Sequence, residues 1–249
     1  MIRILVFGDS IAYGSWDSEG GWVDRIKKQA HKITIDSNGE ERYQIYNLGI
    51  GGGASTNVLA RIQNEIEARV HGSWELKIIL NYGINDQRLI NGTNETSLQD
   101  FSDNTQKIIN IAKNYTKDII VIGLTPLGDD VIDFKDMVYS KDSIKEYDDI
   151  LMKVAIESNV QYIPIRDLFT DSKETDLHAY DKLHINDRGH EIIANVVQPY
   201  IIPTPDIIID ENLKLRQLLP SDAEEFFDII DINREYIIKC YHFHHRRLA

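Results

Sequence analysis

Short apolar runs alternate with longer amphipathic segments along most of the chain. Runs of strand length occur at residues 2–7, 43–48, 76–81, 118–124 and 160–164. Between and after them, apolar residues recur at helical spacing near residues 21–32, 55–70, 98–115, 141–158 and 187–199. Strands that alternate with helices are typical of a parallel sheet with crossover helices. The pattern therefore predicts an α/β domain.

The pattern changes after Pro199. Pro203 and Pro205 are too close together to continue a helix and favour extended chain, so we expect a linker here. We place the main domain at residues 1–203 and a C-terminal extension at 204–249. Because so short an extension can hardly bury a core alone, we expect it to dock on the main domain, to mediate homo-oligomer formation or to stay mobile.

Composition and charge agree with a soluble enzyme of one α/β domain plus an extension. Acidic residues outnumber basic ones by 40 to 27, and the net charge of −13 argues against nucleic-acid or anionic-membrane partners. Cys240 is the only cysteine, which excludes an internal disulfide framework. The apolar start is too short for a signal peptide and no run reaches transmembrane length, so we expect a cytoplasmic protein.

A serine, a histidine and an aspartate have the context that acyl transfer needs. Ser10 follows the first predicted strand through Gly8-Asp9, which puts its hydroxyl at the carboxyl end of a strand, where open α/β sheets bind ligands. A serine hydroxyl is a poor nucleophile unless an imidazole takes its proton, and a carboxylate that fixes the imidazole tautomer improves the base. Asp181, three residues before His184, offers that carboxylate.

Each of these residues also has a purely structural interpretation. A serine after Gly-Asp often forms a turn or caps a helix. His178 and His190 compete with His184, but only His184 has an acid at the required offset. Asp181 could instead cap the last predicted helix or pair with Arg188.

Two segments between the serine and the histidine offer hydrogen-bond donors for an oxyanion. The segment from Asn47 to Ser55 is a strand end, a glycine-rich turn and a helix start, so backbone N–H groups can approach a substrate closely. Asn85 follows another apolar strand and offers a side-chain amide, although with Asp86 it could simply build an Asx-type turn. Asp9 is expected to hold the first turn through backbone contacts.

These four segments resemble the sequence blocks of the SGNH hydrolases, also called the GDSL esterase and lipase family. The blocks occur in the family's order as Gly8-Asp9-Ser10, Asn47 to Gly52, Gly83 to Asp86 and Asp181 to His184. The resemblance covers residues 1–203. It implies a flavodoxin-like three-layer α/β/α sandwich with a parallel sheet of about five strands.

The same resemblance implies a role for each site residue. Ser10 would be the nucleophile, His184 the base and Asp181 the orienting acid of a triad. The oxyanion hole would consist of the N–H groups of Ser10 and Gly52 and the side-chain amide of Asn85. The implied activity is hydrolysis of a carboxylic ester through an acyl-enzyme, which needs no metal or organic cofactor.

The glycine-rich turn leaves two questions open. Residues 51–53 are all glycine, so the second oxyanion donor is Gly52 or an adjacent glycine. Gly49, Gly51 and Ala54 also fit a relaxed dinucleotide fingerprint, although the next predicted strand ends without the acid that would hold a ribose. A dinucleotide-binding oxidoreductase and a non-catalytic binding domain are therefore the alternatives from other classes.

The sequence does not define the ester. Short acyl esters, acetylated sugars, lysophospholipids and thioesters are compatible with the same centre, and we favour a small-molecule ester with a short acyl or acetyl group. The irregular stretches 86–97 and 125–140 follow predicted strands and are candidate pocket walls. Tyr13, Trp16 and Trp22 are candidate lining residues, although aromatic side chains are more often part of a core.

The C-terminal extension carries two further patterns. Residues 211–240 predict a strand, a turn with an N-cap at Ser221 or Asp222 and an amphipathic helix, and they resemble the opening of a GNAT-type N-acetyltransferase. No acetyl-CoA pyrophosphate loop follows, so acetyltransferase activity is not expected. Cys240 and His242 begin a Cys-x-His-x-His-His run whose spacing matches no standard zinc finger, and we expect no metal there.

Overall fold

The computed structural model of the protein describes residues 1–129, 137–170, 176–202, 207–215, 218, 222–234 and 236. The chain divides into two compact units, Met1–Ile201 and Ile202–Ala249.

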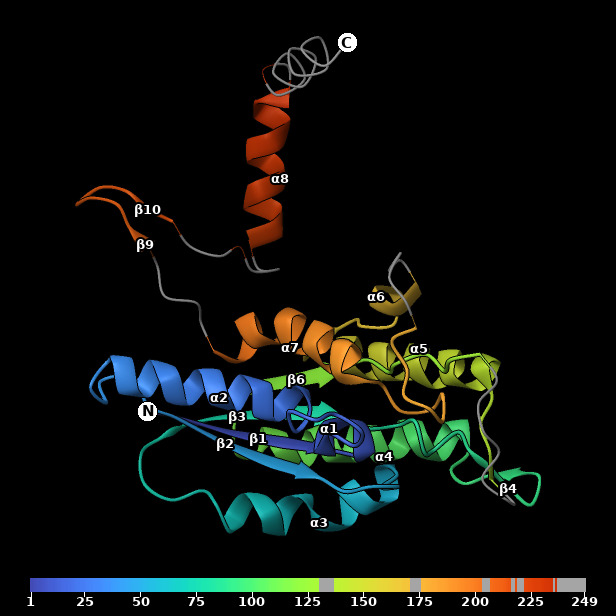
Figure 1. Ribbon diagram of the computed structural model, residues 1–249. Coiled ribbons are helices and arrows are strands. Elements are labelled where there is room, and N and C mark those ends of the chain that lie inside the picture. The colour runs from blue at the N-terminus through green and yellow to red at the C-terminus, as the bar shows by residue number, and fades with distance from the viewer. Residues whose placement is uncertain are drawn as a thin grey trace. The chain divides into compact units, whose positions relative to one another are not determined.

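The first unit is built on a five-stranded parallel sheet (Figure 1). The strands lie in the order β2 (Tyr43–Gly49), β1 (Ile2–Gly8), β3 (Glu75–Asn81), β6 (Asp118–Ile122) and β8 (Gln161–Ile163). In chain order this is 2-1-3-4-5, the strand order of the flavodoxin-like fold. The expected fold class is confirmed.

Helices cover both faces of this sheet. Figure 1 shows α2 (Gly21–Asp36) and α7 (Asp187–Ile201) on one face and α3 (Ser55–Glu67) and α4 (Leu98–Lys113) on the other, the face that α5 (Lys141–Glu157) also covers. Leu5 and Ile78 of the sheet belong to a buried core with Ile62 of α3 and Ile108 of α4. All five predicted strands and all five predicted long helices are present, with ends shifted by a few residues.

Two predictions about local structure need correction. Helix α7 continues through Pro199 to Ile201, because Ile201 is buried and Lys77 Nζ donates a hydrogen bond to the Tyr200 carbonyl. The stretches predicted to be irregular contain β4 (Leu89–Ile90), β5 (Thr93–Asn94) and β7 (Met137–Val138), which form a small antiparallel sheet. Two-residue strands are too short to produce a hydrophobic period, so the sequence pattern cannot reveal them.

The register of the sheet brings three loops to one level. Gly8 at the end of β1 lies opposite Gly49 of β2 and Asn81 of β3. A side chain at Gly8 would not fit, because a Cβ there would lie 2.4 Å from the Asn81 carbonyl oxygen and 2.4 Å from the Ala12 Cβ. The loops after the three strands therefore begin side by side at the carboxyl edge, where ligands bind in open α/β sheets.

The second unit contains an antiparallel pair, β9 (Ile207–Ile208) and β10 (Lys214–Leu215), and the helix α8 (Ala223–Ile232). The predicted strand and helix are present, whereas β9 was not expected so close to the linker. Pro203, Pro205 and the segment from Cys240 to His245 lie outside the described residues. Within the described part of the chain, no helix has the length and apolar character needed to cross a bilayer.

Candidate active site

Ser10 is the first residue of the short helix α1 (Ser10–Tyr13), directly beyond the end of β1. Its side chain is nearly buried. The preceding Asp9 accepts a hydrogen bond from the Ile11 N–H at 2.9 Å, so it holds the turn through the backbone as expected. The N–H of Ser10 belongs to the first turn of α1, where backbone N–H groups have no acceptor within the helix.

His184 connects Ser10 to Asp181. Its Nε2 lies 2.9 Å from Ser10 Oγ and its Nδ1 lies 2.7 Å from Asp181 Oδ2. When Nδ1–H donates to the carboxylate, Nε2 carries no proton and can accept the serine proton. The arrangement is chemically that of a nucleophile, a general base and an orienting acid.

Asp181 is held as a carboxylate in a buried position. Only 1% of its surface is exposed, and its Oδ1 accepts the backbone N–H groups of Leu183 at 3.1 Å and His184 at 2.9 Å. Burial raises the pKa of Asp181, but the hydrogen bonds and the charge of His184 outweigh it, so the pKa lies below its ordinary value. Arg188, the alternative partner, pairs with Glu191 at 2.7 Å.

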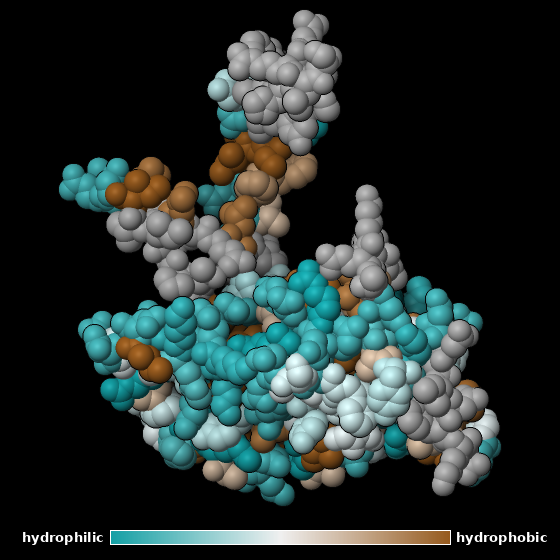
Figure 2. Space-filling view, viewed as in Figure 1, coloured by the Kyte–Doolittle hydropathy of each residue, from teal (hydrophilic) through white to brown (hydrophobic). Residues whose placement is uncertain are grey.

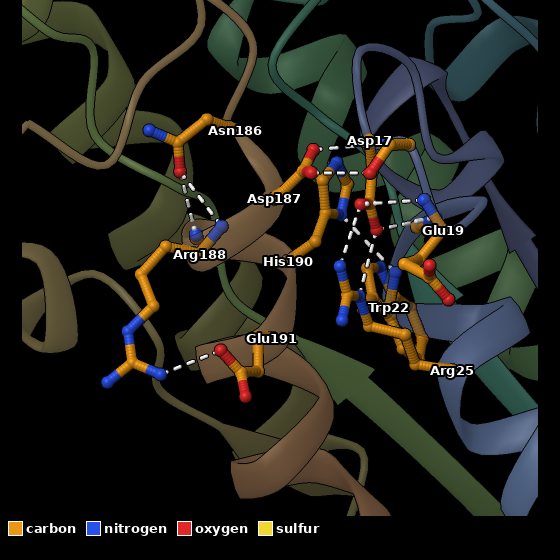
Figure 3. Close-up of polar contacts among 12 residues, drawn as sticks. Asp17, Glu19, Trp22, Arg25, Asn186, Asp187, Arg188, His190 and Glu191 are labelled. Carbon is orange, nitrogen blue, oxygen red and sulfur yellow. Dashed lines mark hydrogen bonds and ion pairs between the residues drawn. The ribbon is translucent and has the colours of Figure 1, made fainter.

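The two competing histidines lie in other environments. His178 Nε2 lies 2.9 Å from the Pro126 carbonyl oxygen. His190 is fully buried and accepts the Trp22 N–H at 3.3 Å (Figure 3). Burial lowers the pKa of His190 to about 4, so the ring is neutral at neutral pH. Among the described residues, neither histidine makes a hydrogen bond to Ser10.

Asn85 is a buried amide at the end of the loop after β3. Its Nδ2 donates one hydrogen bond to the Gly53 carbonyl at 3.0 Å, and its Oδ1 accepts from the Tyr139 hydroxyl at 3.1 Å. Arg88 Nη1 lies 3.4 Å from the same oxygen. An amide nitrogen has two protons, so this arrangement fixes the amide and leaves one N–H available.

The neighbouring Asp86 does not face the glycine-rich turn as Asn85 does, but binds the N-terminus of α3. It accepts hydrogen bonds from the N–H of Ser55 at 2.9 Å and from its hydroxyl at 2.6 Å, at the N-terminus of α3. Burial raises the pKa of Asp86 to about 6. The pair therefore consists of an amide toward the glycine turn and a carboxylate that anchors a helix.

In the glycine-rich turn after β2, one of the backbone N–H groups that could serve as an oxyanion donor is already hydrogen-bonded. The Gly53 N–H donates to the Ile50 carbonyl at 3.0 Å, so it is already used. Gly52 has φ +73°, and in the described part of the chain its N–H has no hydrogen-bond partner. Asn47 is structural, because its Nδ2 donates to the Ala12 carbonyl at 2.9 Å and ties β2 to α1.

The candidate lining aromatics have three different positions. Trp22 is completely buried, so it belongs to the core and not to a pocket wall. Tyr13 is exposed and lines a cavity of about 440 Å³ together with Asp17 and Asn47. Trp16 contacts the expected orienting acid, with its Nε1 3.0 Å from Asp181 Oδ2. Trp16 is one of the candidate lining residues, and Arg88 and Tyr139 lie in the stretches 86–97 and 125–140 expected as pocket walls, but no motif indicates their individual contacts.

A comparison with protein-family models matches residues 6–192 to the GDSL-like lipase/acylhydrolase family. The chain belongs to this family. The resemblance to SGNH hydrolases is thereby confirmed, and the protein is a hydrolase of ester bonds. The assignment also removes the reason to interpret the glycine-rich turn as a dinucleotide site.

Solved structures of GDSL-type hydrolases share the fold. A lipase/acylhydrolase from Enterococcus faecalis matches with a TM-score of 0.65 at 22% identity, over 82% of this chain and 100% of that chain. Axe2, an acetylxylan esterase from Geobacillus stearothermophilus, matches with a TM-score of 0.63 at 19% identity, over 81% of this chain and 94% of that chain. TesA matches with a TM-score of 0.61 at 18% identity, over 81% of this chain and 98% of that chain. A sequence comparison with curated proteins gives no match.

Proposed function

We propose that this GDSL-family hydrolase is a serine esterase that cleaves carboxylic esters through an acyl-enzyme intermediate. The observation that carries the proposal is the continuous chain of contacts from Ser10 Oγ to His184 Nε2 at 2.9 Å and from His184 Nδ1 to Asp181 Oδ2 at 2.7 Å. Such contacts allow a serine to lose its proton as it attacks a carbonyl carbon.

In the first half of the reaction, His184 takes the hydroxyl proton while Ser10 Oγ bonds to the ester carbonyl carbon. The carbonyl oxygen becomes an oxyanion, and the N–H groups of Ser10 and Gly52 and the free N–H of Asn85 stabilise it. His184 then gives its proton to the alkoxide leaving group. In the second half, water attacks the acyl-enzyme by the same route and releases the acid.

We further propose a short acyl or acetyl group. Tyr139 and Arg88 both bond to Asn85 Oδ1, so polar side chains border the amide, whereas a long alkyl chain needs an apolar wall. Arg88 Nη2 also lies 3.4 Å from the Gly52 carbonyl oxygen. The structural neighbour Axe2 is an acetylxylan esterase, so the ester of that enzyme is an acetyl ester. A lysophospholipase or thioesterase of the same family is the alternative.

The test is hydrolysis of p-nitrophenyl acetate, butyrate and octanoate by the wild-type protein and by Ser10→Ala, at neutral pH with a chelator present. We expect a drop of ~10³ or more in kcat for Ser10→Ala and the highest kcat/KM for acetate. Ser97→Ala is the matched control, because Ser97 also stands at a helix N-terminus, where it accepts the Asp100 N–H at 3.1 Å.

The outcomes distinguish the proposals. Equal activity in Ser10→Ala and the wild type would remove Ser10 from the mechanism. A preference for octanoate, or activity on a thioester alone, would retain the serine mechanism and replace the short-acyl proposal.

We also propose that the chemistry is confined to the domain at residues 1–203. All five candidate site residues lie in the first unit. Limited proteolysis that removes the extension should leave kcat on p-nitrophenyl acetate unchanged. Size-exclusion chromatography before and after the cut tests whether the extension forms a homo-oligomer, which predicts a fall in apparent mass to that of a monomer. A loss of activity on cleavage would contradict the confinement.

A further inference from the structure

Trp16 has a position that burial of apolar surface does not explain. More than half of the residue, 54%, is exposed. Its backbone has φ +68°, in the left-handed region, which is unfavourable for any residue with a Cβ. Residues held in such conformations cluster at functional sites. The contacts of the Trp16 side chain are therefore the place to look for the reason for its backbone conformation.

The indole of Trp16 contacts the acid and the base of the proposed triad. Its Nε1 lies 3.0 Å from Asp181 Oδ2 and 2.9 Å from His184 Nδ1. His184 Nδ1 carries a proton when it donates to Asp181, so it cannot accept a second one. The indole N–H therefore donates to Asp181 Oδ2, the oxygen that also accepts from His184.

This bond completes the fixation of the carboxylate. Asp181 Oδ1 accepts two backbone N–H groups, and Oδ2 accepts the imidazole and the indole, so each oxygen is held from two directions. The Trp16 ring also lies edge-on to the imidazole of His184, with centroids 5.8 Å apart and an interplanar angle of 87°. On its other side it contacts Tyr180 at 5.7 Å.

The loop that carries Trp16 is fastened to the segment that carries His184. Ser18 donates to the Asp187 carboxylate from its N–H at 3.0 Å and from its hydroxyl at 2.5 Å. Asp187 is the first residue of α7, three positions after His184. The residue before Ser18, Asp17, accepts the Gly21 N–H at 2.9 Å and pairs with Arg25 (Figure 3).

We propose that Trp16 is a positioning residue for ester hydrolysis, whose indole N–H holds the Asp181 carboxylate in the orientation that His184 needs. The inference rests on the proposed function, because it assigns Trp16 to the Ser10–His184–Asp181 mechanism. Trp16 acts through Asp181 and contacts no reacting atom. Its left-handed backbone is the conformation in which this loop presents the indole to the triad.

The test is Trp16→Phe, which keeps an aromatic ring and removes the N–H. Loss of a hydrogen bond to a charged group can change a rate by about tenfold. We therefore expect kcat on p-nitrophenyl acetate to fall about tenfold, with KM unchanged. The rate at which a p-nitrophenyl phosphonate modifies Ser10 should fall by the same factor. The matched control is Trp74→Phe, the same substitution at a half-buried tryptophan that contacts Arg3 and His71 at the end of β3 opposite Asn81, and it should alter neither rate.

A double-mutant cycle separates positioning from a structural role. If Trp16 acts through Asp181, Trp16→Phe has no further effect on either rate in an Asp181→Ala background. Wild-type rates in Trp16→Phe, or an undiminished effect of Trp16→Phe in that background, would each overturn the inference. If Ser10→Ala reacts as fast as the wild type, the proposed function fails instead, whatever Trp16 does.

Discussion

Helices α3 and α8 have the same kind of amphipathic sequence and opposite environments. In α3, Val58, Ile62 and Ile66 are at most 1% exposed, because the helix packs against the sheet. In α8 none of the described side chains is buried, and residues such as Phe227 and Ile229 are more than half exposed. Figure 2 shows hydrophobic residues, in brown, at the surface of this helix. An apolar stripe thus predicts a helix and the face that should be covered, but a partner surface decides whether it is covered.

The packed interior of the first unit has a direct bearing on chemistry. Ser10, Asn85 and Asp181 are 7%, 2% and 1% exposed, although all three are polar. Where water is excluded, hydrogen bonds and charges interact more strongly than they do at a solvated surface. No comparable set of buried polar groups exists among the described residues of the second unit, where the side chains beyond Ile202 are exposed or half-buried.

The largest effect expected from this comparison is a loss of turnover when a buried polar group of the first unit is removed. Asn85→Ala should lower turnover of p-nitrophenyl acetate by ~10²–10³, because it removes one of the proposed oxyanion donors from a site with little access to water. Asn104→Ala is the control, since Asn104 is another buried amide and donates to Ser55 Oγ at 3.0 Å. It should lower the free energy of unfolding and change turnover little. Similar turnover losses in both variants would mean that Asn85 acts only through folding.

The next effect compares the two helices directly. Ile62→Ala in α3 should lower the free energy of unfolding by about 2–5 kcal/mol, because it leaves a cavity in the core. Ile229→Ala in α8 should change it by about 0.5 kcal/mol or less, because Ile229 is exposed. Urea unfolding followed by circular dichroism measures both, since that signal reports helices in either unit. A large loss for Ile229→Ala would show that a surface covers α8 in solution.

A further effect depends on pH and concerns a carboxyl group whose charged form is disfavoured by burial. Burial raises the pKa of Asp9 from 3.8 to about 7. A carboxyl whose pKa is raised by folding favours the folded state most at low pH, so this contribution is lost as the pH rises from 3.8 to about 7. Asp9→Asn, whose Oδ1 can still accept the Ile11 N–H, should remove that slope when the unfolding free energy is measured against pH.

Asp17 provides a control of opposite sign. Burial raises the pKa of Asp17, but the hydrogen bond from Arg25 and those from the backbone outweigh it and lower the pKa to about 2. Its contribution is fully present above pH 3.8 and is lost as the pH falls through about 2. Asp17→Asn should therefore lower stability by a constant amount between about pH 4 and pH 7. An unchanged slope in Asp9→Asn would mean that Asp9 is ionised in the folded protein throughout this range.

The sequence reveals long elements and linear motifs, and it does not reveal contacts between distant loops. The five strands and the long helices follow from periodicity, which each segment displays by itself. The antiparallel sheet of β4, β5 and β7 is invisible, because two-residue strands have no period. The burial of His190 is likewise not predictable from its own segment, since α2 and the loop before it supply the cover.

The sequence by itself determined the α/β class through its periodicity, and its four motifs carried the family resemblance that implied the flavodoxin-like fold and the candidate roles of Ser10, Gly52, Asn85, Asp181 and His184. These depend on residue types at short spacing, and short spacing is a local property. Only the tertiary structure decided that the Gly53 N–H bonds to Ile50, that Tyr139 and Arg88 bond to Asn85, and that Trp16 donates to Asp181 across 165 positions. A hydrogen bond needs two groups within about 3 Å, and for residues far apart in sequence only the packed fold sets that distance.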